Sequence, residues 1–136
     1  MNRLEFQNLT VERFEDAEAL LKCGRYACAY YICGYAIECA LKACIAQRTR
    51  AGDFPPKNAQ TYYSHDLTRL LEIAGLAADY RKEAAADPSF DENWGIVKDW
   101  TEEARYRSVS ERQAARMLAA VGDADHGVLR WLRQNW

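Results

Sequence analysis

Residues 26–46 read YACAYYICGYAIECALKACIA, an almost uninterrupted apolar run on which the rest of the fold depends. The run is long enough to span a membrane. It contains Glu38 and Lys42, however, and each charge costs about 2.5–3.5 kcal/mol at a bilayer centre. A helix that is apolar nearly all round is buried by its neighbours. We therefore predict a central helix from about Arg25 to Arg50 inside a bundle, with no membrane contact.

The composition sets the class of the molecule. The chain has 136 residues, of which 49% are hydrophobic and 28% charged, and its net charge is −2. These values predict one soluble domain over residues 1–136 and exclude a global basic field for nucleic acid. Three prolines and seven glycines favour helices over a β sandwich. Five cysteines without a secretory signal indicate thiols in a reducing cytoplasm, most simply as small buried hydrophobes.

Apolar spacing and capping residues predict the other helices. The last one begins at Ser110, where Ser110 and Gln113 form a capping box, and continues through an apolar seam that includes one acid, Asp125. Residues 53–63 contain two prolines and predict a loop. The remaining helices are predicted over residues 8–22, from a cap at Ser64 or Asp66 to Gly75, over 77–86, and over 88–100, with Asp87 as the N-cap and Pro88 as the first helical residue of the last of these. Only two or three residues separate the helix over 8–22 from the central helix, so these two are predicted to form an antiparallel hairpin. The fold class is therefore all-α, an up-and-down bundle of four or five helices.

Motifs for metals and cofactors are lacking in this sequence. The segment Asp123-Ala-Asp125-His-Gly127 resembles the start of a calcium loop, but the glycine and the twelfth residue do not fit. The two histidines, His65 and His126, lie in different predicted elements. No glycine-rich phosphate loop, nucleophile elbow or zinc-protease motif occurs. We therefore expect no metal and no cofactor.

Four polar residues of the central helix share one narrow face. Tyr31, Tyr35, Glu38 and Lys42 are separated by four, three and four residues. Charges on an otherwise apolar helix need partners. The pair is therefore either a structural ion pair, completed by Asp125 or an arginine, or a polar patch that lines a cleft.

Arginines surround the predicted start of the last helix: Arg105, Arg107, Arg112 and Arg116, with Tyr106 between the first two. Free N–H groups and the helix dipole favour anions at a helix N-terminus. Guanidinium groups bind phosphate bidentately, and a tyrosine can stack on a base. These five residues are the best candidates for a phosphate or RNA contact. The alternative is a solvated arginine face that pairs with Glu102, Glu103 and Glu111.

The central helix resembles that of HEPN domains (higher eukaryotes and prokaryotes nucleotide-binding), whose members often read Tyr-x-x-Gly-Tyr-Ala-x-Glu-x-Ala-Leu-Lys-Ala. The matching positions here are Tyr31, Gly34, Tyr35, Ala36, Glu38, Ala40, Leu41, Lys42 and Ala43. The later stretches Ser64-His65-Asp66-Leu67 and Trp100 to Tyr106 are also similar to prokaryotic members. The resemblance covers most of the chain.

This resemblance implies a helical bundle that is commonly dimeric. Many members are metal-independent endoribonucleases of toxin–antitoxin, phage-defence or CRISPR systems, and others partner a nucleotidyltransferase. The ribonucleases have an arginine followed after four to six residues by a histidine, near the start of the last helix. Here the window after Arg105 and Arg107 holds no histidine, and His126 is too distant. A general acid or base is therefore missing from its usual place.

Two functions follow as hypotheses from the sequence. The preferred one is a cytoplasmic homodimer that is not an enzyme, binds a nucleotide or RNA, and serves as the partner of a nucleotidyltransferase or another toxin–antitoxin or phage-defence component. The alternative is a divergent endoribonuclease that uses the arginine cluster, with Glu38 or His65 as the proton-transfer group. A structural dimer without a ligand would bind no phosphate at all.

Overall fold

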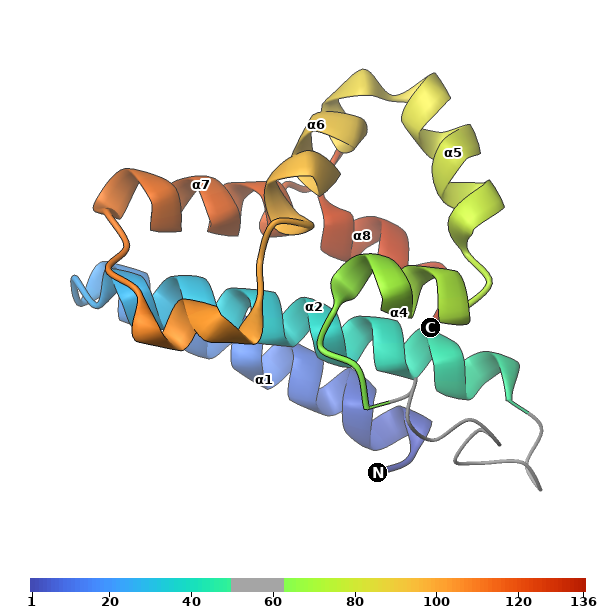
Figure 1. Ribbon diagram of the computed structural model, residues 1–136, viewed down its shortest axis with the longest axis horizontal. Coiled ribbons are helices and arrows are strands. Elements are labelled where there is room, and N and C mark those ends of the chain that lie inside the picture. The colour runs from blue at the N-terminus through green and yellow to red at the C-terminus, as the bar shows by residue number, and fades with distance from the viewer. Residues whose placement is uncertain (50–62) are drawn as a thin grey trace.

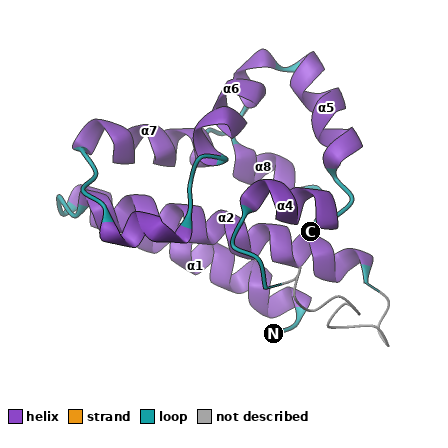
Figure 2. Cartoon of the chain, in the orientation of Figure 1, coloured by secondary structure: helices purple, strands orange, loops and turns teal. Residues whose placement is uncertain are grey.

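The computed structural model describes residues 1–49 and 63–136, and every regular element in this part of the chain is a helix (Figures 1 and 2). This confirms the predicted all-α class. The predicted loop lies outside the described residues, except for Tyr63. The elements are α1 (Arg3–Lys22), α2 (Tyr26–Arg48), α4 (Leu67–Ile73), α5 (Ala77–Ala86), α6 (Pro88–Val97), the 3₁₀ helix η1 (Glu102–Tyr106), α7 (Glu111–Gly122) and α8 (Val128–Arg133).

Helices α1 and α2 form the predicted antiparallel hairpin and lie side by side along the base of the molecule in Figure 1. The turn between them contains Gly24, whose φ of +76° is accessible mainly to glycine. Helix α1 begins five residues before the predicted start at Asn8. A capping box causes this difference, because Asn2 Oδ1 accepts from the Glu5 N–H at 2.9 Å and Glu5 Oε2 accepts from the Asn2 N–H at 2.6 Å.

Helix α2 is the central helix of the bundle, as predicted. From Cys33 to Ile45 only Tyr35 retains intermediate exposure, and every other residue is buried. Helices α1, α4, α7 and α8 pack around α2 together with η1. The length and apolar composition of α2 would suit a membrane span, but 72% of its most apolar window is buried by the protein itself. That burial is the pattern of a core helix. Of the cysteines, Cys33, Cys39 and Cys44 are buried as predicted, whereas Cys23 and Cys28 are exposed.

Aspartates cap two of the shorter helices. Asp66, one of the two predicted caps of α4, accepts from the Arg69 N–H at 3.1 Å. Asp87 caps α6, accepting from the Phe90 N–H at 3.2 Å, with Pro88 in the first turn as predicted. Helix α6 ends at Val97, before the predicted end near Trp100, and η1 follows after a short connection.

The predicted final helix is wrong as one continuous element, because a turn at residues 123–127 separates α7 from α8. Asp123 Oδ1 accepts from the N–H groups of Asp125 at 2.9 Å and His126 at 2.6 Å, which offers the backbone an alternative to helical bonding. A side chain on Gly127 would overlap the Asp123 carbonyl. Asp125 is consequently exposed in the turn, and it neither joins the seam nor completes the ion pair of α2.

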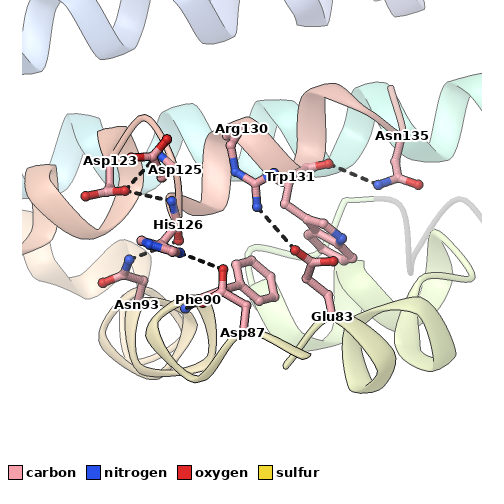
Figure 3. A network of polar contacts seen from close by, with 10 residues as sticks. All are labelled: Glu83, Asp87, Phe90, Asn93, Asp123, Asp125, His126, Arg130, Trp131 and Asn135. Atoms are coloured by element: carbon pink, nitrogen blue, oxygen red, sulfur yellow. Dashed lines mark hydrogen bonds and ion pairs between the residues drawn. The ribbon is translucent and has the colours of Figure 1, made fainter. Parts of the chain in front are cut away.

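Polar contacts connect this turn and α8 to α5 and α6 (Figure 3). His126 Nδ1 lies 2.7 Å from Asp87 Oδ2, and the His126 carbonyl accepts from Asn93 Nδ2 at 3.0 Å. Arg130 of α8 contacts Glu83 of α5 at 3.2 Å. Helix α6, which contacts α7 directly, is therefore also held by the turn before α8.

Candidate functional site

The arginine-bearing segment runs along η1 and into α7. Arg105 and Tyr106 end η1, and Arg107 follows as its C-terminal cap. The predicted capping box is present: Ser110 Oγ accepts from the Gln113 N–H at 3.1 Å, and Gln113 Oε1 accepts from the Ser110 N–H at 2.9 Å. The start of α7 is thus well defined, and it places the next arginines at fixed positions on the helix.

A cleft of about 810 Å³ lies between α6, η1 and α7. Arg107 and Arg116 line it, together with Tyr30 of α2, Glu92 of α6, and Asp99. We call this site the arginine cleft. Its volume falls within the range of small-molecule sites, roughly 300–1,000 Å³. The fold therefore brings together two of the five residues predicted to contact phosphate.

The other three predicted residues do not line the arginine cleft. Tyr106 is 78% exposed, and the guanidinium of Arg105 lies 4.9 Å from the centre of its ring. Interaction with Tyr106, and to a lesser extent with Tyr31, raises the pKa of Arg105. Arg105 is therefore engaged with tyrosines. Arg112, in the first turn of α7, is exposed.

Ion pairing with neighbouring acids was the alternative interpretation of this cluster. Arg107 agrees with this interpretation, because its Nη2 lies 3.7 Å from Glu103 Oε2. Both side chains of this pair are exposed. Such pairs contribute little and are screened by salt. Arg105, Arg112 and Arg116 form no ion pair with any residue that the structure describes. Most of the positive charge in the cluster is therefore not neutralised by the protein.

Charges of both signs act on the arginine cleft. Burial and the Asp99 carboxylate raise the pKa of Tyr30, whereas Arg107 acts on it in the opposite direction. Tyr30 therefore lies within the electrostatic reach of an acid and a base that line the same cleft. Asp99 was not identified from the sequence, because no local pattern connects residue 99 with residues 107 and 116.

The second candidate site is the polar face of α2, where Glu38 and Lys42 form the predicted ion pair. Lys42 Nζ lies 2.9 Å from Glu38 Oε1, and both residues are buried. The acid has a further partner, since His65 Nδ1 lies 3.0 Å from each of its carboxylate oxygens. Of the two interpretations of this face, the structural ion pair is therefore present, but His65 completes it in place of Asp125 or an arginine.

His65 connects three parts of the fold. It precedes α4, contacts Glu38 of α2, and lies 3.8 Å from Glu102 of η1. About half of its side chain is exposed, and it lines an open pocket of about 480 Å³ beside Trp100. A buried carboxylate that fixes Nδ1 leaves Nε2 as the nitrogen available for other contacts. The clue in the sequence was a buried acid on α2 that needed a second partner.

The two tyrosines of the predicted face have different surroundings. The ring of Tyr31 packs against Trp100, with 6.0 Å between the ring centroids. Tyr35 lies beside Cys39 and Arg13, and burial with the Cys39 contact raises the pKa of Tyr35 to about 12. Tyr31 thus lies beside Trp100 and close to Arg105 of η1. Tyr35 forms no hydrogen bond with His65.

Metal ligands do not gather in the described part of the chain, where no group of three His, Cys, Asp or Glu side chains is arranged to hold an ion. The residues of the arginine cleft instead suit a ligand that has an anionic group and hydrogen-bond donors.

Comparison with known proteins agrees with this helical arrangement. The family model of the HEPN domain matches residues 11–133, from α1 to the end of α8. No curated protein and no solved structure matches the chain. The family match indicates a function related to nucleotides or RNA in general. Because the match spans most of the sequence, the chain belongs to the HEPN domain family.

Proposed function

We propose that this HEPN domain is a phosphate-binding module that associates with a nucleotide or RNA without cleaving it. The observation that carries the proposal is the presence of Arg107 and Arg116 in one cleft, with no acid neutralising Arg116 among the described residues. Guanidinium forks bind phosphate oxygens in pairs. The proposed ligand is therefore a phosphate group of a nucleotide or an RNA strand.

Binding at this site is expected to be weak and sensitive to salt. Two arginines neutralise few phosphate charges, and the net charge of the chain is −2. Affinity for a polyanion falls as salt rises, because bound counterions are released when the protein binds. The test is a titration with ATP and with labelled single-stranded RNA at low and high salt.

A matched pair of variants makes this titration specific. Arg107→Ala with Arg116→Ala should abolish most of the binding. Arg69→Ala with Arg81→Ala changes the net charge equally at exposed positions of α4 and α5 and should retain it. Equal affinity in both double variants would mean that the arginine cleft is only a solvated surface.

We further propose that the protein works in the cytoplasm as a homodimer and as the partner subunit of a nucleotidyltransferase, toxin–antitoxin or phage-defence component. Family membership and the lack of a histidine after Arg105 and Arg107 support a binding subunit rather than a nuclease. Light scattering of the purified chain measures its oligomeric state. Co-expression with the products of adjacent reading frames tests the partnership, and recovery of the chain alone would contradict it.

A second candidate function is a divergent metal-independent endoribonuclease. The contact between the buried Glu38 and the half-exposed His65 favours it, because a carboxylate that orients a histidine is a common arrangement for proton transfer. His65 would accept the proton of a ribose 2′-hydroxyl while the 2′-oxygen displaces the 5′-oxygen from phosphorus. A proton returned from His65 would then complete the departing 5′-hydroxyl.

Incubation with total RNA and a chelator separates the two functions. The binding proposal predicts intact RNA. Cleavage that persists in the chelator, disappears in Arg105→Ala and His65→Asn, and continues in His126→Asn would establish the nuclease instead. His126 is a suitable control because it lies in the turn before α8, bound to Asp87.

A further inference from the structure

The arginine cleft is lined by charges of opposite sign that form no ion pair with one another. Arg116 belongs to α7 and Arg107 caps η1, whereas Asp99 follows α6. Asp99 makes neither a hydrogen bond nor an ion pair with any described residue, and the acid that pairs with Arg107 is Glu103. Because these charges line one cleft without pairing with one another, a ligand bound there meets an unpaired acid as well as two bases.

We infer that the arginine cleft binds a ribonucleotide as a whole unit, with the phosphate on Arg107 and Arg116 and the ribose hydroxyls on Asp99. This inference rests on the proposed phosphate-binding function and adds the specificity of the same cleft. It makes Asp99 a specificity-determining residue.

The chemistry of a carboxylate supports this arrangement. A carboxylate repels a phosphate, so Asp99 opposes the binding of a bare phosphate ion. The same group accepts hydrogen bonds from hydroxyl donors, and the two neighbouring hydroxyls of a ribose match its two oxygens. A ligand that has both an anionic group and hydroxyl donors can therefore bind the two arginines and Asp99 at once.

Tyr30 lines the same cleft as the acid and the bases. Its pKa is raised by burial and by Asp99 and lowered by Arg107, so both charges act near this one side chain. Glu92 of α6 adds a second acid to the lining. The volume of about 810 Å³ suits one nucleotide rather than a duplex.

The test compares three ligands: AMP, 2′,3′-dideoxy-AMP and inorganic phosphate. AMP should bind the native protein about tenfold more tightly than the dideoxy compound, since hydrogen bonds to a charged group are strong. Asp99→Ala should remove this difference and leave the affinity for inorganic phosphate equal or higher. Glu111→Ala removes the same charge from an exposed position of α7 outside the cleft, and the difference should persist.

The outcomes separate this inference from the proposal on which it rests. Equal binding of AMP and dideoxy-AMP, lost in both cases when Arg107 and Arg116 become alanine, would overturn the role of Asp99 and leave the phosphate site intact. A higher affinity of Asp99→Ala for all three ligands would do the same. Failure of every ligand to bind the native protein would remove the proposed function and this inference together.

Discussion

At Gly34 a missing side chain lets Trp100 pack against α2, because a Cβ atom there would overlap the indole ring. We predict that Gly34→Ala lowers the free energy of unfolding by at least about 1 kcal/mol, since overpacking a buried site costs roughly 1–3 kcal/mol. Gly95→Ala in α6 is the matched control, because its Cβ would have open space. It should stabilise the helix by about 0.5–1 kcal/mol. Urea unfolding measures both variants, and equal losses of stability would contradict the packing argument.

Glu38 and His65 are in contact but should contribute unequally to the stability of the fold. Glu38 bonds both Lys42 and His65, whereas His65 is half-exposed and can bond water. Glu38→Ala should therefore destabilise the fold by more than His65→Ala, with a loss of about 1–3 kcal/mol for the buried group. Denaturant unfolding of the two single variants and the double variant gives the coupling energy. A zero coupling would show that the contact does not stabilise the protein.

At the scale of elements, the contact between Asp87 and His126 connects α6 to the turn before α8, and it makes stability depend on pH. The hydrogen bond to Asp87 raises the pKa of His126 above its ordinary 6.5, and the same bond lowers the pKa of Asp87 below 3.8. Because the pKa of His126 is raised on folding, its stabilising contribution is complete below about pH 6.5. This contribution is lost as the pH rises through the pKa of His126 in the folded protein. Because the pKa of Asp87 is lowered on folding, its stabilising contribution is complete above about pH 3.8. It is lost as the pH falls through the pKa of Asp87 in the folded protein.

The contact between Asp87 and His126 should therefore contribute most to the free energy of unfolding between about pH 4 and 6.5. Asp87→Asn isolates this effect, because asparagine still caps a helix N-terminus. The difference in unfolding free energy between the native protein and Asp87→Asn should be larger at pH 5.5 than at pH 8.5. The same difference at both values would show that the charge on His126 contributes nothing.

These elements also show how far sequence reasoning reaches. The hairpin, the central helix and the caps at Asp66, Asp87 and Ser110 were predicted because they depend on residues close together in the chain. The break between α7 and α8 was missed, since the apolar spacing continues across the turn and hides the competing bonds of Asp123. The early start of α1 depended on a capping box at the N-terminus that was also overlooked.

The arginine cleft is a property of the whole molecule. Tyr30, Asp99, Arg107 and Arg116 come from separate elements, and only the packing of α6 and η1 with α2 and α7 brings them together. Sequence reasoning identified the arginines by their local clustering. It missed Asp99. It paired Glu38 correctly with Lys42 but named Asp125 or an arginine as the further partner, because His65 lies 27 residues away in the chain.

The positive charge of the arginine cleft determines how RNA binding responds to salt. For single-stranded RNA, the logarithm of the binding constant should fall with the logarithm of the salt concentration with a slope near −0.7 for each phosphate neutralised. Two arginines in one cleft therefore predict a slope of about −1.4 for a short oligonucleotide that reaches one copy. If the proposed homodimer places two clefts on one strand, a longer oligonucleotide should give about twice that slope. Fluorescence anisotropy from about 50 to 300 mM salt measures both values. A slope that is unchanged when Arg107 and Arg116 become alanine would place the RNA elsewhere on the surface.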